Sequence, residues 1–222
     1  MRGRFITFEG GEGSGKSTQT KLLAERLRAF GISVVLTREP GGSVGAEAVR
    51  HVLLSGAAKP FGAHAETILF AAARDDHLRQ TIRPALDSGK WVISDRFADS
   101  TRIYQGSLGN VDPRLIARLE RITIGDTRPD LTIILDVAVD VGLERASSRR
   151  GKNPGDRFEA EDRSFHEKLR EAYRELAERQ PDRCVLIDGS ADAATVANSV
   201  WATVNERLRP AEAPFQLEDA AP

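Results

Sequence analysis

Short apolar runs rich in β-favouring side chains recur along the chain, and segments with helical spacing of apolar positions lie between them. The apolar runs predict strands at residues 5–8, 33–37, 91–94, 131–135 and 184–187. The intervening segments predict helices at residues 16–30, 44–54, 63–86, 113–124, 140–148, 161–179 and 193–208. This alternation indicates an α/β fold in which helices cover both faces of a mainly parallel, five-stranded sheet.

Three breaks in the pattern refine this picture. Pro84 falls inside the predicted helix at 63–86 and predicts a kink or a break there. A polar stretch at about 149–158 contains glycine and proline and predicts a short exposed segment. Residues 210–222 are rich in proline and acidic side chains, which predicts a disordered tail. Residues 1–209 are therefore expected to form a single domain.

Composition narrows the possible partners and the compartment. The formal net charge is -1, so no strong global field favours nucleic acid or an anionic membrane, and neither is expected as a partner. The single cysteine, Cys184, lies in an apolar run and is interpreted as a core residue rather than a reactive thiol. A disulfide framework is excluded. Without a signal-like or membrane-spanning apolar stretch, the sequence predicts a soluble cytoplasmic protein.

A glycine-rich loop joins the first predicted strand to the first predicted helix. The string Gly10-Gly-Glu-Gly-Ser-Gly-Lys-Ser matches the phosphate-binding pattern G-x4-G-K-[ST] in full. Its glycines let backbone N–H groups turn inward around phosphate oxygens, and the helix N-terminus adds a favourable dipole. Lys16 is expected to reach the β- and γ-phosphates of a nucleotide, and the Ser17 hydroxyl to ligate Mg²⁺. The predicted fold is therefore a three-layer P-loop NTPase fold. The expected triphosphate site consists of Gly10, Gly11, Glu12, Gly13, Ser14, Gly15, Lys16, Ser17 and Thr18.

The phosphate loop does not identify what receives the phosphate. GTPases, transport ATPases and small kinases all use it. A guanine-nucleotide switch usually carries Asn-Lys-x-Asp and Asp-x-x-Gly motifs, and neither occurs in this sequence. A regulatory ATPase or GTPase is therefore only a remote alternative to a kinase.

Asp95 and Arg96 directly follow the third predicted strand. Ligands of open α/β sheets bind at the carboxyl ends of such strands, so the position itself indicates a site. Asp95 is expected to hold Mg²⁺, directly or through a bound water. Arg96 is expected to clamp an acceptor phosphate and the transferring group with its planar fork. The alternative is a surface ion pair.

Five short strings, in this order along residues 3–208, make the chain resemble the thymidylate (dTMP) kinases. They are Thr37-Arg-Glu-Pro-Gly-Gly, Phe70-Ala-Ala-Ala-Arg, Asp95-Arg-Phe, Arg128-Pro-Asp-Leu-Thr and Asp156-Arg-Phe-Glu. The resemblance implies a five-stranded parallel sheet and the reaction ATP + dTMP → ADP + dTDP, in dTTP synthesis. It also implies Mg²⁺ and a homodimer, for which the segments beginning at Val44 and Ala63 are candidates.

The resemblance further implies which residues bind dTMP. It gives Phe70 a stacking role on thymine and Arg74 a hydrogen bond to a thymine carbonyl, although the pattern alone favours Phe70 as a core residue. It places Arg38 at the acceptor phosphate and Glu9 near the sugar 3′-hydroxyl; a solvated surface role is the alternative for each.

The stretch that follows Arg96 is implied to contact the base and sugar. The implied residues are Ser100, Thr101, Tyr104 and Gln105. An aromatic side chain at Tyr104 would clash with a ribose 2′-hydroxyl, which gives a steric reason for a preference for deoxyribose. Ordinary helix packing is the alternative for Tyr104.

The basic segment at 149–158 is interpreted as a lid that closes over phosphates. Because the phosphate loop holds Glu12, where an arginine occurs in one branch of the family, the chain resembles the bacterial branch with its catalytic arginine in the lid. Arg149 and Arg157 are expected to join Lys16 and Arg96 as catalytic residues. Arg150 and Lys152 are alternatives, and a solvated basic loop is the other interpretation.

The remaining expectations concern the adenine site, the alternative acceptors and the histidines. Arg145 is expected to stack on adenine, and residues 188–191 to complete that site. A UMP/CMP kinase or a deoxynucleoside kinase is the main alternative function. The four histidines form no cluster and are assigned no catalytic or metal role; they are His51, His64, His77 and His166.

Overall fold

The computed structural model describes residues 2–150 and 158–210. Within these residues the strands form a five-stranded, fully parallel sheet in the order β2-β3-β1-β4-β5, which confirms the predicted fold class. The strands are β1 (Phe5–Glu9), β2 (Val34–Arg38), β3 (Trp91–Asp95), β4 (Leu131–Asp136) and β5 (Cys184–Asp188). Each contains its predicted run almost unchanged.

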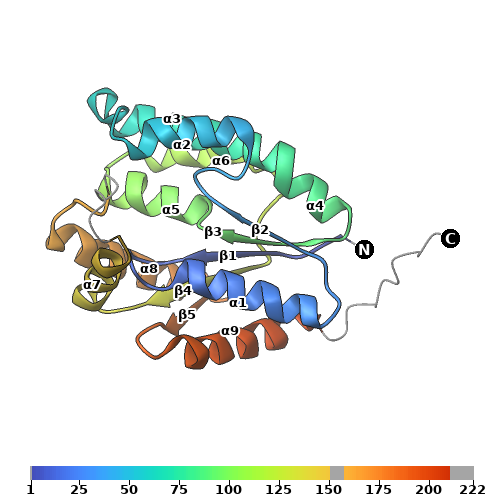
Figure 1. The fold of residues 1–222 in the computed structure, drawn as a ribbon. Helices are drawn as coiled ribbons and strands as arrows, with labels where there is room; N and C mark the ends of the chain where they lie inside the picture. The colour runs from blue at the N-terminus through green and yellow to red at the C-terminus, as the bar shows by residue number, and fades with distance from the viewer. Residues whose placement is uncertain (1, 151–157, 211–222) are drawn as a thin grey trace.

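Helices cover both faces of the sheet, so the molecule has three layers (Figure 1). The α-helices are α1 (Lys16–Ala29), α2 (Val44–Leu54), α3 (Gly62–His77), α4 (Arg83–Asp87), α5 (Ala98–Thr101), α6 (Pro113–Thr123), α7 (Val139–Arg150), α8 (Arg163–Arg179) and α9 (Ala193–Leu208). Three shorter helical turns of other types are η1 (Lys59–Phe61), η2 (Leu78–Ile82) and η3 (Arg102–Leu108).

Alternation along β1 divides the core between the two faces. Ile6 and Phe8 pack in the cluster that contains Leu23 of α1 and Val200 of α9. Phe5 points to the other face and packs in the cluster formed with η2 and α4. The two-residue period of a strand therefore builds both helix layers against one central strand.

The predicted helix at 63–86 is interrupted, as Pro84 indicated. α3 ends at His77, a π-helical turn spans η2, and α4 begins at Arg83 with Pro84 in its first turn. Proline lacks the N–H group that a continuous α-helix needs, and the first turn of a helix is where this loss is tolerated. Pro84 therefore stands at the start of a new α-helical segment.

The helical segment made of α5 and η3 was not predicted as an element. Its sequence from Asp99 to Thr101 is polar and its Gly106 is a poor helix former, so local propensity is weak. Ile103 and Tyr104 are nevertheless buried, and packing against α8 and β4 holds the segment in place. Tertiary contacts override propensity here.

Some sequence expectations concern parts of the chain with little or no described structure. Of the predicted tail, residues 211–222 lie outside the described residues, as do residues 151–157 of the predicted lid.

Cys184 is buried, as expected of a core residue, and burial raises the pKa of its thiol to about 11. Among the described residues, no helix has the length and apolarity to cross a membrane.

Candidate active site

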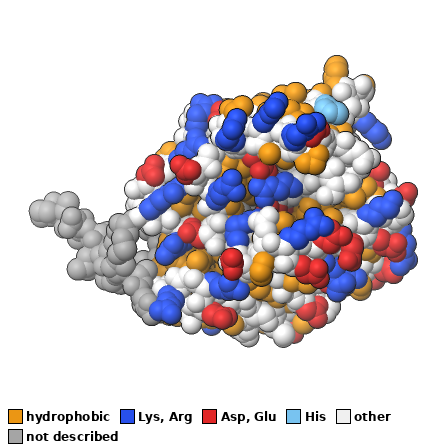
Figure 2. All heavy atoms as spheres, turned by 180° about the vertical axis from the view of Figure 1, so that it is seen from behind, with side chains coloured by type: hydrophobic (Ala, Val, Ile, Leu, Met, Phe, Trp, Pro, Cys, Tyr) orange, Lys and Arg blue, Asp and Glu red, His pale blue; other side chains and the backbone are white. Residues whose placement is uncertain are grey.

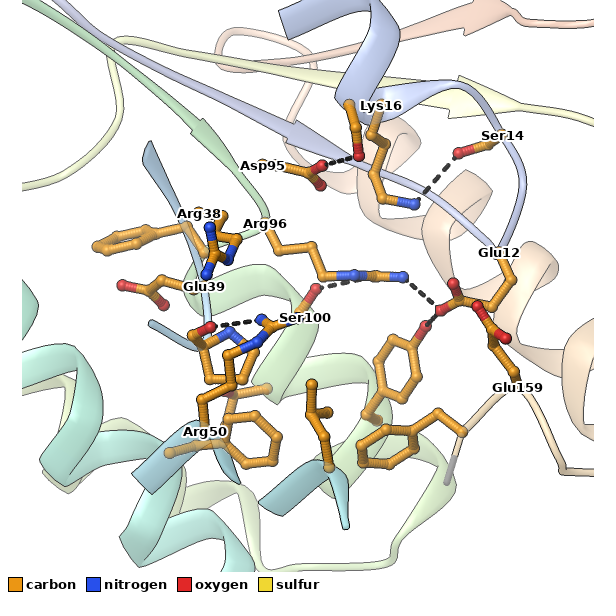
Figure 3. Close-up of a pocket in the computed structure, with 18 of the residues that line it drawn as sticks. Glu12, Ser14, Lys16, Arg38, Glu39, Arg50, Asp95, Arg96, Ser100 and Glu159 are labelled. Carbon is orange, nitrogen blue, oxygen red and sulfur yellow. Dashed lines mark hydrogen bonds and ion pairs between the residues drawn. The ribbon is translucent and has the colours of Figure 1, made fainter. Parts of the chain in front are cut away.

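One large cavity opens at the carboxyl edge of the sheet (Figure 3). It joins the loop after β1 to the segments that follow β2 and β3, because parallel strands end at the same edge. Most of the predicted site residues line it: Glu12, Gly13, Ser14, Gly15, Lys16, Ser17, Arg38, Phe70, Arg74, Asp95, Arg96, Ser100, Thr101, Tyr104, Gln105 and Arg149.

The phosphate loop has the backbone shape that its glycines predict. Gly13 has a φ of 65°, and a Cβ there would lie 1.9 Å from the carbonyl oxygen of Gly142 in α7. Gly15 precedes α1, whose first turn receives no hydrogen bond from a capping side chain. The Thr18 and Gln19 N–H groups donate to the Gly15 carbonyl oxygen, so the N–H groups of Lys16 and Ser17 are the ones left for an anion. Gly10 and Gly11 line a smaller cavity behind the loop, and Thr18 is exposed in α1.

The Lys16 ammonium group lies inside the curve of the loop. Its Nζ atom donates to the carbonyl oxygens of Gly10 at 3.1 Å and Gly11 at 2.7 Å, and to Ser14 Oγ at 3.3 Å. Burial, and then the Arg96 charge, lower the pKa of Lys16 to about 8. A phosphate would supply the negative charge that this buried ammonium group needs.

Ser17 and Asp95 bring two oxygen ligands together beside the phosphate loop. Ser17 Oγ donates to Asp95 Oδ2 at 2.5 Å. Mg²⁺ prefers oxygen ligands and is usually held by one or two protein groups together with phosphates and water. Within the described residues there is no cluster of three His, Cys, Asp or Glu side chains, so these two groups match that sparse type of site rather than an all-protein cage.

Arg96 is held in a strained backbone conformation. Its φ is 70°, a left-handed value that is uncommon for a residue with a side chain. Ser94 Oγ donates to the Arg96 carbonyl oxygen at 2.8 Å. The guanidinium group points into the cavity, where Nη2 donates to Glu12 at 2.6 Å and Nη1 donates to Ser100 at 3.2 Å (Figure 3). Nη1 also donates to Tyr173 at 3.2 Å.

Glu12 places a negative charge in the cavity. Burial alone would raise the pKa of this carboxyl, but the Arg96 and Lys16 charges outweigh it and lower the pKa to about 2. The Tyr104 hydroxyl also donates to Glu12 Oε1, at 3.2 Å. Glu12 was predicted within the triphosphate loop, and in addition it pairs with Arg96 on the opposite wall of the cavity.

Glu9 does not line the cavity. It is completely buried at the end of β1, where it accepts hydrogen bonds from the Phe97 N–H at 2.8 Å, Ser100 Oγ at 2.7 Å and Tyr173 Oη at 2.9 Å. Burial, and then the Asp99 charge, raise the pKa of Glu9 to about 7. Its hydrogen bonds tie the end of β1 to α5 and α8, and its partners Phe97 and Ser100 line the cavity that Glu9 itself does not reach.

A second wall of the cavity is aromatic. Tyr104 meets Phe158 edge-on with ring centroids 5.2 Å apart, and Phe70 lies 6.5 Å from Phe158. Arg74 is fixed beside them, since its Nη2 donates to Thr101 Oγ1 at 2.9 Å. The predicted base-binding residues are thus gathered on this wall, which meets the phosphate loop where Tyr104 contacts Glu12.

Comparison with known proteins places the chain. The sequence model of the family described as thymidylate kinase matches residues 8–200. The thymidylate kinase of Nitrobacter winogradskyi is 62% identical over 213 residues, which cover 96% of this chain and 93% of that protein. The chain belongs to the thymidylate kinase family.

Two further relatives agree. The thymidylate kinase of Afipia carboxidovorans is 63% identical over 207 residues, covering 93% of this chain and 91% of that protein. The crystal structure of thymidylate kinase from Ehrlichia chaffeensis superimposes with a TM-score of 0.75 at 35% identity, covering 92% of this chain and all of that one (100%). The resemblance noted from the five short strings is thereby confirmed.

The remaining basic residues of this thymidylate kinase family member are more peripheral. Arg38 donates to Glu47 at 2.8 Å and is half exposed. Arg149 lies 3.4 Å from Glu159 at the rim of the cavity, with its side chain 62% exposed. Arg145 lies away from the main cavity and donates to the carbonyl oxygens of Gly189 and Ser190, at 2.9 Å each. Arg157, Lys152 and the side chain of Arg150 lie outside the described residues.

Several residues at the site had no predicted role. Arg50 of α2 enters the cavity and donates to the Pro40 carbonyl oxygen at 2.6 Å, although no motif surrounds it. Tyr173 reaches Glu9, Ser100 and Arg96 from α8, far along the chain. The others are Glu39, Pro40, Leu54, Phe97, Phe158 and Glu159. Most of these belong to the strings that carry the family resemblance, which was the one available signal.

Proposed function

We propose that the cavity is the active site at which ATP, with Mg²⁺, phosphorylates dTMP to dTDP for dTTP synthesis in the cytoplasm. Membership of the thymidylate kinase family supports the reaction and its two substrates. The observation that carries the assignment is that one cavity contains Lys16 of the phosphate loop, Arg96 and the aromatic wall at Phe70 (Figure 3). Donor and acceptor can therefore meet at Arg96.

The donor half lies at the phosphate loop. ATP phosphates are assigned to the N–H groups of residues 10–18 and to Lys16, and Mg²⁺ to Ser17 and Asp95. When bound there, Mg²⁺ would neutralise negative charge on the phosphates. Arg145 is assigned to the adenine side, because it joins α7 to the loop after β5.

The acceptor half lies between β2, α3 and η3. Arg38 and Arg96 are assigned to the dTMP phosphate, and Phe70 and Arg74 to the thymine base. Tyr104 is assigned to the 2′ carbon of the sugar. The remaining acceptor residues are Ser100, Thr101, Gln105 and, as an indirect support through Ser100, Glu9.

The chemistry needs no nucleophilic side chain. A phosphate oxygen of dTMP attacks the γ-phosphorus of ATP, and the bond from that phosphorus to the β–γ bridging oxygen breaks. Negative charge on the transferring group is neutralised by Lys16, Arg96 and the lid arginines Arg149 and Arg157, and positioning supplies most of the remaining rate.

A panel of acceptors tests the proposal. Purified protein is supplied with ATP and Mg²⁺ and with dTMP, dUMP, UMP, CMP or thymidine, and each phosphorylated product is quantified by chromatography. dTMP is expected to give the highest kcat/KM. Faster phosphorylation of UMP than of dTMP would contradict the assignment, and ATP hydrolysis independent of any acceptor would indicate a regulatory ATPase instead.

The exposed apolar side chains on α2, α3 and α6 support a homodimer. Val52 is 40% exposed, Ile68 52% and Ile122 76%, and α2 packs beside α3, which packs beside α6. Figure 2 shows hydrophobic side chains along this edge of the molecule, interspersed with basic ones. Burial of such a patch against a second copy would remove it from water. Sedimentation equilibrium of the wild type against Ile68→Asp measures the association; a wild type that remains monomeric contradicts it.

A further inference from the structure

A line of four hydrogen-bonded side chains lies behind the aromatic wall of the cavity. Arg74 Nε donates to Glu39 Oε2 at 2.7 Å. The other carboxylate oxygen of Glu39 lies 3.1 Å from His77 Nδ1, and His77 Nε2 lies 2.7 Å from Thr37 Oγ1. The line joins the end of β2 to α3, and two of its members, Glu39 and Arg74, line the cavity.

The protonation pattern of the line follows from its members. The carboxylate of Glu39 faces a guanidinium group and accepts hydrogen bonds only. His77 Nδ1 therefore donates to Glu39, and His77 Nε2 forms a hydrogen bond with the Thr37 hydroxyl, which can either donate or accept. Every polar atom that joins two members is thus satisfied in one arrangement, which favours a single geometry.

The surroundings leave this line little freedom. Glu39 is 6% exposed, Arg74 3% and His77 0%. Gly42 closes over the far end, since a Cβ there would lie 2.4 Å from both His77 Nε2 and Thr37 Oγ1. A buried ion pair is costly unless its geometry is well satisfied, and here packing and hydrogen bonds fix both partners.

Of the three guanidinium nitrogens of Arg74, only Nη1 remains to recognise a ligand. Nε is bound to Glu39, and Nη2 donates to Thr101 Oγ1 at 2.9 Å and to the Phe97 carbonyl oxygen at 3.4 Å. Nη1 donates to none of the described residues, and Arg74 lines the cavity. A guanidinium group clamped on two sides presents its remaining N–H groups in a fixed direction.

We propose that Glu39 and His77 are positioning residues that hold Arg74 Nη1 as a fixed donor, and that this donor discriminates between acceptor bases. The inference rests on the proposed function. A base with a carbonyl oxygen at the Nη1 position accepts a hydrogen bond. A base with an amino group there sets N–H against N–H, and the clamped Arg74 cannot turn away to relieve the mismatch. The line therefore sets the preference of the site for dTMP over dCMP.

Two substitutions at His77 separate its two ring nitrogens. In His77→Asn the amide nitrogen takes the place of Nδ1 and still donates to Glu39, whereas in His77→Gln the longer side chain reaches only the Nε2 position. We expect His77→Gln to lower the ratio of kcat/KM for dTMP to that for dCMP by about tenfold or more, the effect of losing a hydrogen bond to a charged group. His77→Asn should retain the ratio within about threefold.

The kinetic pattern distinguishes positioning from general destabilisation. In His77→Gln the KM for dTMP should rise and the KM for ATP should stay unchanged, and the thermal midpoints of the two His77 variants should be similar. If His77→Gln retains the wild-type dTMP/dCMP ratio, or if both variants lose the ratio equally, the proposal is overturned.

A second pair of variants, with milder substitutions, tests the proposal if the His77 variants do not fold. Thr37→Val removes only the hydroxyl at the far end of the line, and Thr37→Ser restores it. The ratio should fall about threefold in the valine variant and recover in the serine variant, as for loss of one neutral hydrogen bond. An unchanged ratio in Thr37→Val then overturns the inference. Failure of the wild type to phosphorylate dTMP would instead overturn the proposed function.

Discussion

Ser17 and Asp95 are 78 positions apart in the chain, yet Ser17 Oγ donates to Asp95 Oδ2 at 2.5 Å. The contact exists because β3 lies next to β1 in the sheet, with Asp95 in register with Phe8. The last residue of one strand and the first turn of the helix after the other therefore meet. A hydroxyl and a carboxylate at this point form the part of the cavity suited to a hard cation.

Removing the charge of Asp95 should weaken the metal site without removing its shape. In Asp95→Asn we expect the free Mg²⁺ concentration that gives half the maximal rate to rise about tenfold or more, because an amide oxygen is a weaker ligand than a carboxylate. The measurement is the initial rate at saturating ATP and dTMP over a series of free Mg²⁺ concentrations.

Asp136 offers a matched control for Asp95. It also ends a strand, β4, but Arg170 holds it at 2.6 and 2.9 Å, and it does not line the main cavity. Asp136→Asn should leave the Mg²⁺ dependence at the wild-type value. A shift of equal size in both variants would mean that Asp95 has no special relation to the metal.

Arg96 should be essential for turnover and dispensable for ATP binding. We expect Arg96→Ala to lower kcat about a hundredfold or more, the scale found when a preorganised charge donor is removed from a transition state. The affinity for ATP, measured by calorimetry, should stay within about threefold, since the loop N–H groups and Lys16 remain. Near-normal turnover would remove Arg96 from the mechanism.

The backbone of Arg96 allows an independent check on stability. Its φ of 70° is unfavourable for alanine and free of steric cost for glycine. Arg96→Gly should therefore be about 1 kcal/mol more stable to urea than Arg96→Ala, while both variants are equally inactive. Equal stability of the two variants would show that the left-handed conformation is not retained without the arginine.

The parts of the site that local patterns describe were predictable. The phosphate loop is one continuous string, and the position of Asp95 and Arg96 follows from the end of a strand. The pairing of Arg96 with Glu12 across the cavity was not predictable, because these residues are 84 positions apart in the sequence. No pattern of hydrophobic spacing records which charged side chains will meet after folding.

The role of His77 was also not predictable from the sequence. The sequence assigned it no role, because the four histidines form no cluster along the chain. The structure places it against Glu39, 38 positions away, at the end of α3 and directly before the π-helical turn.

The burial of Glu9 was not predictable either. An acidic residue beside a phosphate loop suggests an exposed side chain. However, β1 is the central strand of the sheet, and Tyr173 of α8 covers its last residue.

Tyr104 should exclude ribose through its ring rather than its hydroxyl. The ring is held edge-on to Phe158 at 5.2 Å, and the Arg96 guanidinium carbon lies 5.2 Å from its centre, so it has little room to yield. Tyr104→Ala should lower the preference for dTMP over ribothymidine monophosphate about tenfold or more, whereas Tyr104→Phe should keep it within about threefold. The ratio of kcat/KM values measures this; an unchanged ratio in the alanine variant contradicts the gate.

Glu9 should make the stability of the folded protein depend on pH in a direction opposite to that of an ion-paired carboxylate. Burial and Asp99 raise its pKa from 4.5 to about 7, so between these pH values the folded protein binds a proton that the unfolded chain does not. The free energy of unfolding therefore contains a contribution that falls as pH rises from about 4.5 through about 7, by up to about 3 kcal/mol, and that levels off above about pH 8.

Glu9→Gln isolates this contribution, because the amide does not titrate. Its oxygen can still accept from the Phe97 N–H, and the hydroxyls of Ser100 and Tyr173 can turn to accept from its NH₂ group. Urea unfolding of both proteins at pH 5, 6, 7 and 8 gives the difference in free energy of unfolding at each pH. The wild type should lose stability relative to the variant steadily between pH 5 and 7, and only slightly between pH 7 and 8. A difference that is constant from pH 5 to 8 would mean that Glu9 stays ionised throughout, held by its three hydrogen-bond donors and by Arg96 despite its burial.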